Sequence, residues 1–552
     1  MNWRPLVRLH ISRHLRLPRR PQRRILLTFG LAFAALVFGE RAFAGFADPS
    51  APVNAPLEIV APAGAGPIGD GNLVLVEVKA VDRLDGVVDR VELAFDSDEL
   101  WVSAQQSPED SARWRAIWVD PAPGSHRIRV RAYGVEQQSV VEQSAVIDVQ
   151  DVANTSYIID NPYAGSGAFR KGELHMHSTA SFDGWNSLPP AQDALAYKAK
   201  GYQFVAITDH DLISYPQEVN DASFICIPGY ESTADSGHIT APFATSVVSP
   251  DLPPQQRIDE ILASSGLAIL AHPGWRVGWT GMDFSRLRGY TAIEIFNGGT
   301  TDPAKGSSGN LKLWQDVLNE KGYRNRIWAV AVDDSHQPEA MDRGWVMVKS
   351  PELSSDAIKR SIANGAMYAS NGPSFGAIGV MNGGIAAVSP DAAAIRYFNQ
   401  DGTLLFEGPP ALSVFRPTGK ERWVRVEAVM PDGRTAWSQP FWLMPNAPRA
   451  AFKTSPLGAT LAGQTLPGAR VHVSDRGQYL GSVVAGDDGA FSYDSPELGD
   501  GDHEFWLMAT APWPDQVEGP ATLLTASGTA GFSALDAIGR WIREAPVHSP
   551  RG

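Results

Sequence analysis

Apolar and polar residues alternate in short runs along the chain from about residue 50 to residue 150. Examples are Leu73–Val78, Val91–Phe95 and His126–Ala132, and Gly, Pro, Asp and Ser separate the runs. Alternation with a period of two predicts strands with one buried face, and many short strands between turn residues are typical of an antiparallel sandwich. We therefore predict an Ig-like antiparallel β-sandwich over residues 48–151.

The pattern changes between residues 152 and 385, where short apolar runs alternate with helical stretches that end before a glycine. The four stretches are Ala191–Lys200, Gln255–Ser265, Leu311–Lys321 and Leu353–Asn364. A glycine directly after a periodic segment is a helix stop signal. Strands and helices in alternation predict βα units built on a parallel sheet, either open or closed into a barrel.

Strand patterns return after residue 385. Residues 386–446 include runs such as Trp423–Ala428, and we interpret them as a β extension packed on the preceding domain. Residues 448–528 are predicted to form a second Ig-like β-sandwich, with strands near Ala469–Asp475 and His503–Ala509. A tail, residues 529–552, follows. The chain is thus predicted to be multidomain, α/β plus β.

The first 44 residues have the features of a signal peptide. Residues 1–24 carry eight arginines and no acid, and Ile25–Phe38 is an apolar run too short to span a bilayer. Ala42-Phe43-Ala44 has the small residues of a cleavage site, and Arg23-Arg24 faintly resembles a twin-arginine export signal. We expect cleavage after residue 44 and a periplasmic or secreted protein without stable membrane insertion. An uncleaved membrane anchor is the alternative.

The composition, the cysteine count and the net charge exclude several classes of protein. The 552 residues are 43% hydrophobic and 20% charged, which excludes a disordered chain and a coiled coil. A single cysteine excludes an internal disulfide framework and a cysteine-based zinc site. The expected cleavage removes nine arginines and one glutamate, so the formal net charge falls from −14 to −22. Because nucleic acid binding needs a basic surface, we expect a small-molecule partner instead, and the oligomeric state stays open.

Histidines and acidic residues gather at the ends of the apolar runs between residues 172 and 336. Six of the chain's 12 histidines lie there, each at or near the predicted carboxyl end of a strand. They are His175, His177, His210, His238, His272 and His336, and the acids among them include Asp209, Glu231, Glu294, Asp333 and Asp334. In parallel α/β folds the carboxyl ends of the strands form the edge at which sites are built.

A cluster of partly buried imidazoles and carboxylates is costly unless a cation neutralises it. We therefore predict that these side chains converge on divalent metal ions. Imidazole with carboxylate and without thiolate suits Zn, Mn or Fe(II) better than Ca or Mg. No Gly-x-Ser-x-Gly motif occurs and Cys226 lies inside an apolar strand, so catalysis by a protein nucleophile is disfavoured.

The constellation resembles the polymerase and histidinol phosphatase (PHP) family of metallohydrolases. The motifs that carry the resemblance occur in order within residues 172–336, about 30% of the chain. They are Leu174-His175-Met176-His177-Ser178, Ile207-Thr208-Asp209-His210-Asp211, Gly229-Tyr230-Glu231 with Gly237-His238, Ala271-His272-Pro273 and Asp334-Ser335-His336. The export signal, the flanking β modules and Glu294-Ile295-Phe296-Asn297 look like the carbaryl-hydrolase-like branch.

The resemblance implies a distorted (β/α)7 barrel, similar to a TIM barrel, over residues 152–385 that holds two or three divalent metal ions. It assigns a first metal to His175, His177, Glu231 and Asp334. A second metal would be held by Glu231, as the bridging ligand, with His238 and His272. A third would be held by His210 and His336, with Asp183 as the nearest match to the remaining ligand. Asp209 and Asp333 would either orient imidazoles, by accepting the N–H of the ring nitrogen that does not bind metal, or cap strand ends. For Glu294, a role in orienting an imidazole and a structural role both stay open.

The function that the resemblance implies is hydrolysis of small phosphodiesters or phosphomonoesters, with attack on phosphorus by a hydroxide that bridges two metals. The residues expected to act in catalysis are Glu231, His272, His336 and Asp209. Those expected to bind the substrate are Arg276, Asn297 and Arg343, the two arginines through charge-assisted hydrogen bonds to a phosphoryl group.

Two other functions stay open. The same metals would serve a carboxyl-ester or carbamate hydrolase, as the carbaryl-hydrolase-like branch implies. A cell-surface binding protein, whose sandwiches carry the function and whose barrel is inert, is the third possibility, and the complete set of ligand residues argues against it.

Overall fold

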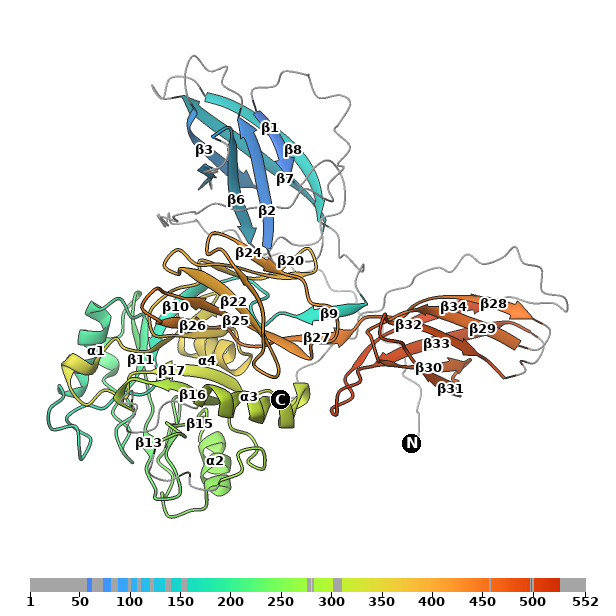
Figure 1. Ribbon diagram of the computed structural model, residues 1–552. Coiled ribbons are helices and arrows are strands. Elements are labelled where there is room, and N and C mark those ends of the chain that lie inside the picture. Colours follow the sequence, from blue (N-terminus) through green and yellow to red (C-terminus); the bar gives the residue numbers. More distant parts are fainter. Residues whose placement is uncertain are drawn as a thin grey trace, which may run out of the picture.

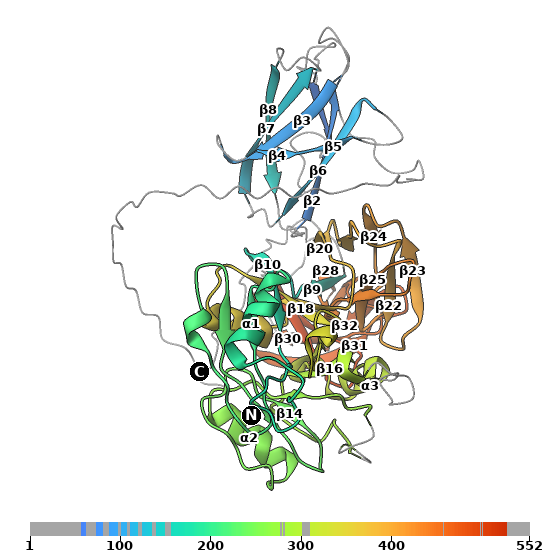
Figure 2. The ribbon, with the colours of Figure 1, turned by 90° about the vertical axis from the view of Figure 1, so that its left-hand side faces the viewer.

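We analysed a computed structural model of the chain (Figures 1 and 2). It describes residues 57–61, 73–80, 88–97, 101–106, 111–119, 124–134, 140–149, 156–275, 279, 282–300, 310–455, 458–496, 498 and 501–526. The expected signal peptide, the tail from residue 529 and Arg276 lie outside these residues. Within them, no helix combines the length and the apolar character needed to cross a membrane.

Residues 57–149 fold as a β-sandwich, as the alternating pattern predicts. Its two antiparallel sheets have the strand orders β1-β2-β6-β5 and β4-β3-β7-β8. The strands are β1 (Leu57–Ala61), β2 (Leu73–Ala80), β3 (Val88–Phe95), β4 (Val102–Ser103), β5 (Gln105–Gln106), β6 (Arg113–Val119), β7 (Gly124–Gly134) and β8 (Val140–Val149). Inward-facing residues of both sheets, such as Val76, Leu93 and Trp114, form one apolar core.

The central region is built on two sheets. The larger has the order β12-β11-β10-β18-β19-β26-β25-β22-β23, and β27 joins it by pairing with β25 and β9. Its strands are β9 (Tyr157–Asp160), β10 (Ala168–Glu173), β11 (Phe204–Ala206), β12 (Ile225–Ile227), β18 (Trp345–Ser350), β19 (Met367–Ser370), β22 (Ala394–Asn399), β23 (Leu404–Gly408), β25 (Trp423–Val429), β26 (Thr435–Trp437) and β27 (Phe441–Pro445). Only β10, β11 and β12 run parallel; the other pairs in this sheet are antiparallel.

The smaller central sheet has the order β13-β14-β15-β16-β17, with β15, β16 and β17 parallel. Its strands are β13 (Glu231–Ser232), β14 (Ile239–Thr240), β15 (Ile269–Leu270), β16 (Ala292–Asn297) and β17 (Trp328–Val332). The two sheets meet just beyond β10 and β17, where the backbone N–H of Asp334 donates to the carbonyl of His175 at 2.7 Å. The carboxyl ends of both parallel sets therefore lie together.

The four helices occur where the sequence pattern predicts them. They are α1 (Pro190–Ala199), α2 (Pro254–Ala263), α3 (Asn310–Lys321) and α4 (Ser355–Ala363). Gly201 and Gly322 follow two of these helices with left-handed φ angles of 85° and 73°, as a glycine stop requires. After α2, Ser265 and not Gly266 takes the left-handed conformation, with a φ of 64°.

The barrel expected from the resemblance is wrong. The central strands form two open sheets with only three parallel strands each, and the described residues contain four α-helices. Most of the central strands are linked by loops or hairpins, and β18 and β19 run antiparallel to their neighbours, so the sheet cannot close as a ring of βα units. The architecture is predominantly β, and helices α1 and α2 lie at the outside of the central region (Figures 1 and 2).

The β extension is part of the central sheet. The expected border between residues 385 and 386 falls inside β21 (Gly384–Val388), which pairs with β20 (Ala377–Met381) and β24 (Ser413–Phe415) in a three-stranded sheet. Strands β22, β23, β25, β26 and β27 extend the larger sheet beyond β19. Side chains of the three-stranded sheet pack against Leu73, Leu75 and Ile117 of the N-terminal sandwich.

Residues 449–526 form the second sandwich, seen at the right of Figure 1. Its sheets have the orders β28-β29-β32 and β31-β30-β33-β34. The strands are β28 (Arg449–Ser455), β29 (Gly458–Gln464), β30 (Arg470–Asp475), β31 (Gln478–Val484), β32 (Ala490–Asp494), β33 (His503–Thr510) and β34 (Glu518–Ala526). Leu461, Val473, Phe505 and Leu507 lie in its core.

Candidate metal centre

All six central histidines converge where the two parallel strand sets meet. Five of them follow the carboxyl end of a strand, as expected, whereas His238 directly precedes β14. The ligand atoms fall into overlapping groups in which all atoms are within 4.8 Å of one another. The groups are His175, His177 and Glu231; His175, His272 and Asp334; His210, Glu231 and His238; and His177, Asp183, His210 and His336. Every metal ligand expected from the sequence is thus present in one connected cluster.

Glu231 occupies the middle of the cluster. Its Oε1 lies 3.0 Å from Nδ1 of His238 and 3.2 Å from Nε2 of His272. Its Oε2 lies 2.9 Å from Nδ1 of His210 and 3.4 Å from Nε2 of both His175 and His177. Five imidazoles therefore surround one fully buried carboxylate.

Asp334 closes the other side of the His175–His177 pair. Its Oδ1 lies 3.4 Å from Nε2 of His175 and 3.2 Å from Nε2 of His177, and these two nitrogens are 3.1 Å apart. Asp334 and His272 have positive φ angles, 48° and 27°. Such angles are uncommon outside glycine and concentrate at functional sites, where the surrounding structure imposes them.

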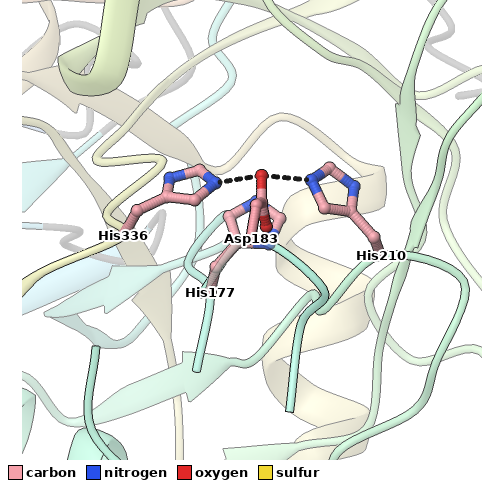
Figure 3. A group of neighbouring side chains, drawn as sticks. All are labelled: His177, Asp183, His210 and His336. Atoms are coloured by element: carbon pink, nitrogen blue, oxygen red, sulfur yellow. Dashed lines mark hydrogen bonds and ion pairs between the residues drawn. The ribbon is translucent and has the colours of Figure 1, made fainter. Parts of the chain in front are cut away.

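Asp183 forms a third, more accessible group with two histidines (Figure 3). Its Oδ2 lies 3.1 Å from Nε2 of His210 and 3.0 Å from Nε2 of His336, and His177 lies directly behind. The side chains of Asp183 and His336 are each 35% exposed, whereas those of His175 and His177 are fully buried. This group is the side of the cluster that faces solvent.

The carboxylates and imidazoles shift one another's pKa. Burial raises the pKa of Glu231 and Asp334, but the imidazoles of His175 and its neighbours outweigh burial and hold both pKa values well below their usual range. Burial lowers the pKa of His210, but Asp183 and Glu231 outweigh it and raise that pKa to about 10. Without a metal ion, protonated imidazoles therefore balance the charge of the acids.

Two buried polar atoms in the cluster make no hydrogen bond, although the groups around them are polar. They are Oε2 of Glu231 and Nδ1 of His272. Three imidazole nitrogens lie close to Oε2, but none is aligned to donate to it. Buried polar groups are normally paired. Unpaired ligand atoms that converge on shared space, all of them nitrogen or carboxylate oxygen, are what a bound Zn, Mn or Fe(II) ion requires.

Glu294 orients two of the histidines. Its Oε1 lies 2.7 Å from Nδ1 of His175, and its Oε2 accepts the backbone N–H of His272 at 2.7 Å. The side-chain amide of Asn297 donates to Glu294 and, at 3.1 Å, to Asp334. The register of β16 shifts between Glu294 and Phe296, and this bulge turns Glu294 and Asn297 to the same side of the strand. Glu294, left open by the sequence, is a positioning residue.

Several expected roles take a different form. Asn297, expected to bind the substrate, is fully buried. Its side-chain amide donates to Glu294 and Asp334 and accepts the backbone N–H of Thr300. The guanidinium of Arg343 donates to the carbonyls of Gly298 and Glu339. Of these two side chains, Asn297 contacts one proposed ligand, Asp334, and Arg343 contacts none.

The two aspartates beside ligands hold loops in place. Asp209, expected in catalysis, accepts hydrogen bonds from the backbone and hydroxyl of Ser178, both at 2.7 Å, and from the hydroxyl of Ser214. Asp333 accepts the backbone N–H groups of residues 342–344 and the hydroxyl of Tyr197. Two roles were expected for these aspartates, orienting an imidazole or capping a strand end. Both act as caps beside strand ends, and neither accepts an imidazole N–H.

Sequence reasoning missed Arg257 on α2. Its fully buried guanidinium donates to the carbonyls of Ser232 and Gly237 and to the hydroxyls of Ser232 and Ser236. These residues form the loop that carries Glu231 at one end and His238 at the other. Arg257 therefore fixes the distance between two proposed ligands. The sequence signal available was an arginine four residues before Ile261, on the apolar face of the predicted helix, and it does not indicate which groups the arginine contacts.

Comparisons with known proteins leave the family open. No protein-family model matches the chain, and no curated protein matches it either. Among solved structures, an endo-beta-1,4-mannanase from Thermotoga petrophila is 11% identical over 18% of this chain and 21% of its own, with a TM-score of 0.15. Fibronectin(III)-like modules of Clostridium thermocellum CbhA are 15% identical over 26% of this chain and 83% of theirs, with a TM-score of 0.11. Bacteroides uniformis beta-glucuronidase 3 is 8% identical over 86% and 77%, with a TM-score of 0.14.

Proposed function

We propose that the chain is a metal-dependent hydrolase of small phosphate monoesters or diesters. The observation that carries the proposal is the sharing of Glu231, Asp334 and Asp183 among six imidazoles, with buried ligand atoms at Glu231 and His272 that make no hydrogen bond. A purely structural role would leave these groups paired one to one.

The residues that would hold the ions divide into three overlapping sets. His175, His177, Glu231 and Asp334 would hold one ion, and Glu231, His238 and His272 a second. Asp183, His210 and His336 would hold a third. When bound, such ions lower the pKa of water toward neutrality and neutralise the charge on a phosphoryl group.

The groups around the proposed ligands determine which ring nitrogen carries a proton and how each imidazole is oriented. Glu294 accepts from Nδ1 of His175, which leaves Nε2 of that ring free as a ligand atom. Nδ1 of His336 lies 3.1 Å from the carbonyl of Asp334, so it carries a proton and Nε2 faces Asp183. His336 has the most exposed ring of the six. It is therefore the ring best placed to pass a proton to a departing oxygen when it is not held as a ligand.

A second candidate, hydrolysis of carboxyl esters or carbamates, is favoured by the aromatic rings beside the cluster. Phe182 stacks on His210 with ring centroids 4.6 Å apart, and Trp275 packs edge-on against His272 at 5.2 Å. The side chains of Phe182 and Trp185 are 75% and 77% exposed. Apolar surface at this position suits an ester with an apolar group.

One experiment separates these functions. The purified chain is reconstituted with Mn²⁺ or Zn²⁺, analysed for metal, and assayed on p-nitrophenyl phosphate, bis(p-nitrophenyl) phosphate, p-nitrophenyl acetate and a naphthyl carbamate. We expect two or three ions per chain and turnover of a phosphate ester. Turnover of only the acetate and the carbamate would assign the second function. A chain that binds no metal after reconstitution would exclude both.

A further inference from the structure

The outer face of one sheet in the C-terminal sandwich exposes two large aromatic side chains. This sheet, β31-β30-β33-β34, buries alternate residues such as Val471, Val473 and Leu507 and turns the residues between them outward. Tyr479 is 60% exposed and Trp506 is 41% exposed. An aromatic side chain that stays in contact with water contributes little to folding. Exposed aromatic residues that share one face of a sheet are therefore typical of a binding site.

The register of the strands places the two aromatic residues in one row. Ser474 of β30 pairs with Tyr479 of β31 on one side and with Trp506 of β33 on the other. Residues that pair directly point to the same face. Since neighbouring strands are about 4.8 Å apart, the two aromatic residues are about 10 Å apart across a small serine. Leu523 of β34, paired with Trp506, continues the row.

The next row of outward residues contains two polar side chains and one thioether. It contains Ser482, His472 and Met508, which pair across β31, β30 and β33. Burial and the nearby Arg470 lower the pKa of His472, so its ring is neutral at pH 7. Its Nε2 lies 2.7 Å from the hydroxyl of Thr510. Hydroxyl and imidazole groups thus lie beside the aromatic row, and we call these two rows the aromatic platform.

Charge and area limit what the aromatic platform can bind. Arg470 and Glu504 flank the two rows on opposite sides, and the guanidinium of Arg470 donates to the hydroxyl of Ser482 in the second row at 3.2 Å, so one cation and one anion border the platform. Nucleic acid would need cationic groups alongside the stacking rings. At their observed exposure the two aromatic residues and Val484 offer on the order of 300 Å² of apolar surface. A stable contact with a second chain needs roughly 800 Å² on each partner.

We propose that the aromatic platform binds a single chain of a neutral polysaccharide. The C–H faces of a pyranose ring are apolar and slightly positive, and they stack on the negative face of an aromatic ring. Two rings about 10 Å apart suit sugar rings that are not adjacent in the chain, with the residue between them over Ser474. The hydroxyl of Ser474 supplies hydrogen bonds, and so does the O–H of Ser482, whose oxygen accepts from Arg470. This site is independent of the metal centre and would hold the hydrolase on a glycan surface.

Isothermal titration of the full chain with cellohexaose, xylohexaose and mannohexaose tests the proposal. We expect saturable binding to at least one of these uncharged hexasaccharides. Trp506→Ala should weaken it at least about tenfold, which corresponds to loss of one stacking contact of about 1.4 kcal/mol. Trp506→Phe keeps a ring and should retain most of the binding. Phe406→Ala removes a partly exposed aromatic ring from β23, outside both the platform and the metal centre, and should leave glycan binding unchanged.

Several results would overturn the proposal. One is absence of saturable binding to all three hexasaccharides by a chain with a normal circular dichroism spectrum. Another is binding that is unchanged in both Trp506→Ala and Tyr479→Ala. A concentration-dependent dimer that Trp506→Ala abolishes would assign the platform to a second copy. Binding that appears only after removal of residues 527–552 would assign it to that segment of the chain. None of these results bears on hydrolysis at the metal centre.

Discussion

Histidines in the central region and in the sandwiches have opposite surroundings. In the C-terminal sandwich, the fully buried ring of His503 lies 2.7 Å from Asp475, and that carboxylate faces no second imidazole within the described residues. In the central region one carboxylate, Glu231, faces five imidazoles. Asp475 also faces the guanidinium of Arg476 at 3.3 Å, so protein groups satisfy this carboxylate, whereas Oε2 of Glu231 makes no hydrogen bond. The arrangement of histidine partners, more than histidine content, indicates a metal site.

The largest effect that would test this contrast is expected from Glu231→Gln. Loss of the shared carboxylate charge should remove bound metal and lower kcat/KM by about a thousandfold or more, because the two inner sets of ligands both use it. Elemental analysis and steady-state kinetics measure the two effects. Asp475→Asn is the matched control in the sandwich and should change neither. Wild-type metal content in Glu231→Gln would remove the distinction between the two regions.

Glu294→Gln should have a smaller effect. The amide is neutral and a poor acceptor for Nδ1 of His175, so we expect metal affinity to fall about 10- to 100-fold. Competition with a chelator measures the affinity. Excess metal should restore most of the activity, since all direct ligands remain. If affinity is unchanged, Glu294 serves only the packing of β16.

Metal affinity should depend on pH. Asp183 and Glu231 raise the pKa of His210 to about 10, so this ring is protonated at neutral pH in the metal-free chain and must lose its proton to bind a metal. Affinity should therefore rise with pH, by about tenfold per unit for each proton released, between pH 6 and 8. Titration calorimetry in buffers of different ionisation enthalpy counts the protons. Zero proton release would show that the imidazoles are already neutral.

The smallest effect is expected at Asp193 on α1, a buried acid outside the cluster. Neither oxygen has a hydrogen-bond partner, and burial, with a contribution from Asp209, raises its pKa to about 8. An unfolded chain releases this proton near pH 4, so the residue destabilises the fold increasingly as pH rises from about 4 to 8. Asp193→Asn should raise stability by on the order of 2 kcal/mol at pH 8 and by less at pH 5. Thermal unfolding at both pH values measures this; an equal gain at both would show that the proton is not involved.

The sequence indicated which side chains gather in the cluster but not which residues hold them in position. The helices before Gly201 and Gly322 and the strands that end at His175 and Glu231 follow from local periodicity and stop residues. Glu294 contacts two histidines and Arg257 contacts the loop of Glu231 and His238, all of them 20 or more residues away, and no local pattern indicates which group a buried side chain will meet. Asn297 shows the same limit, because only the bulge in β16 turns its side chain toward Glu294 and Asp334.

The sequence alone determined which residue types stand at strand ends, because a period of two or 3.6 and the residues that interrupt it are local properties. That was enough to expect imidazoles and carboxylates along one edge. The tertiary structure decided that this edge belongs to two open sheets and not to a barrel, because strand direction and pairing depend on contacts between distant segments. It also decided which nitrogen faces which oxygen, and the proposed chemistry depends on those orientations.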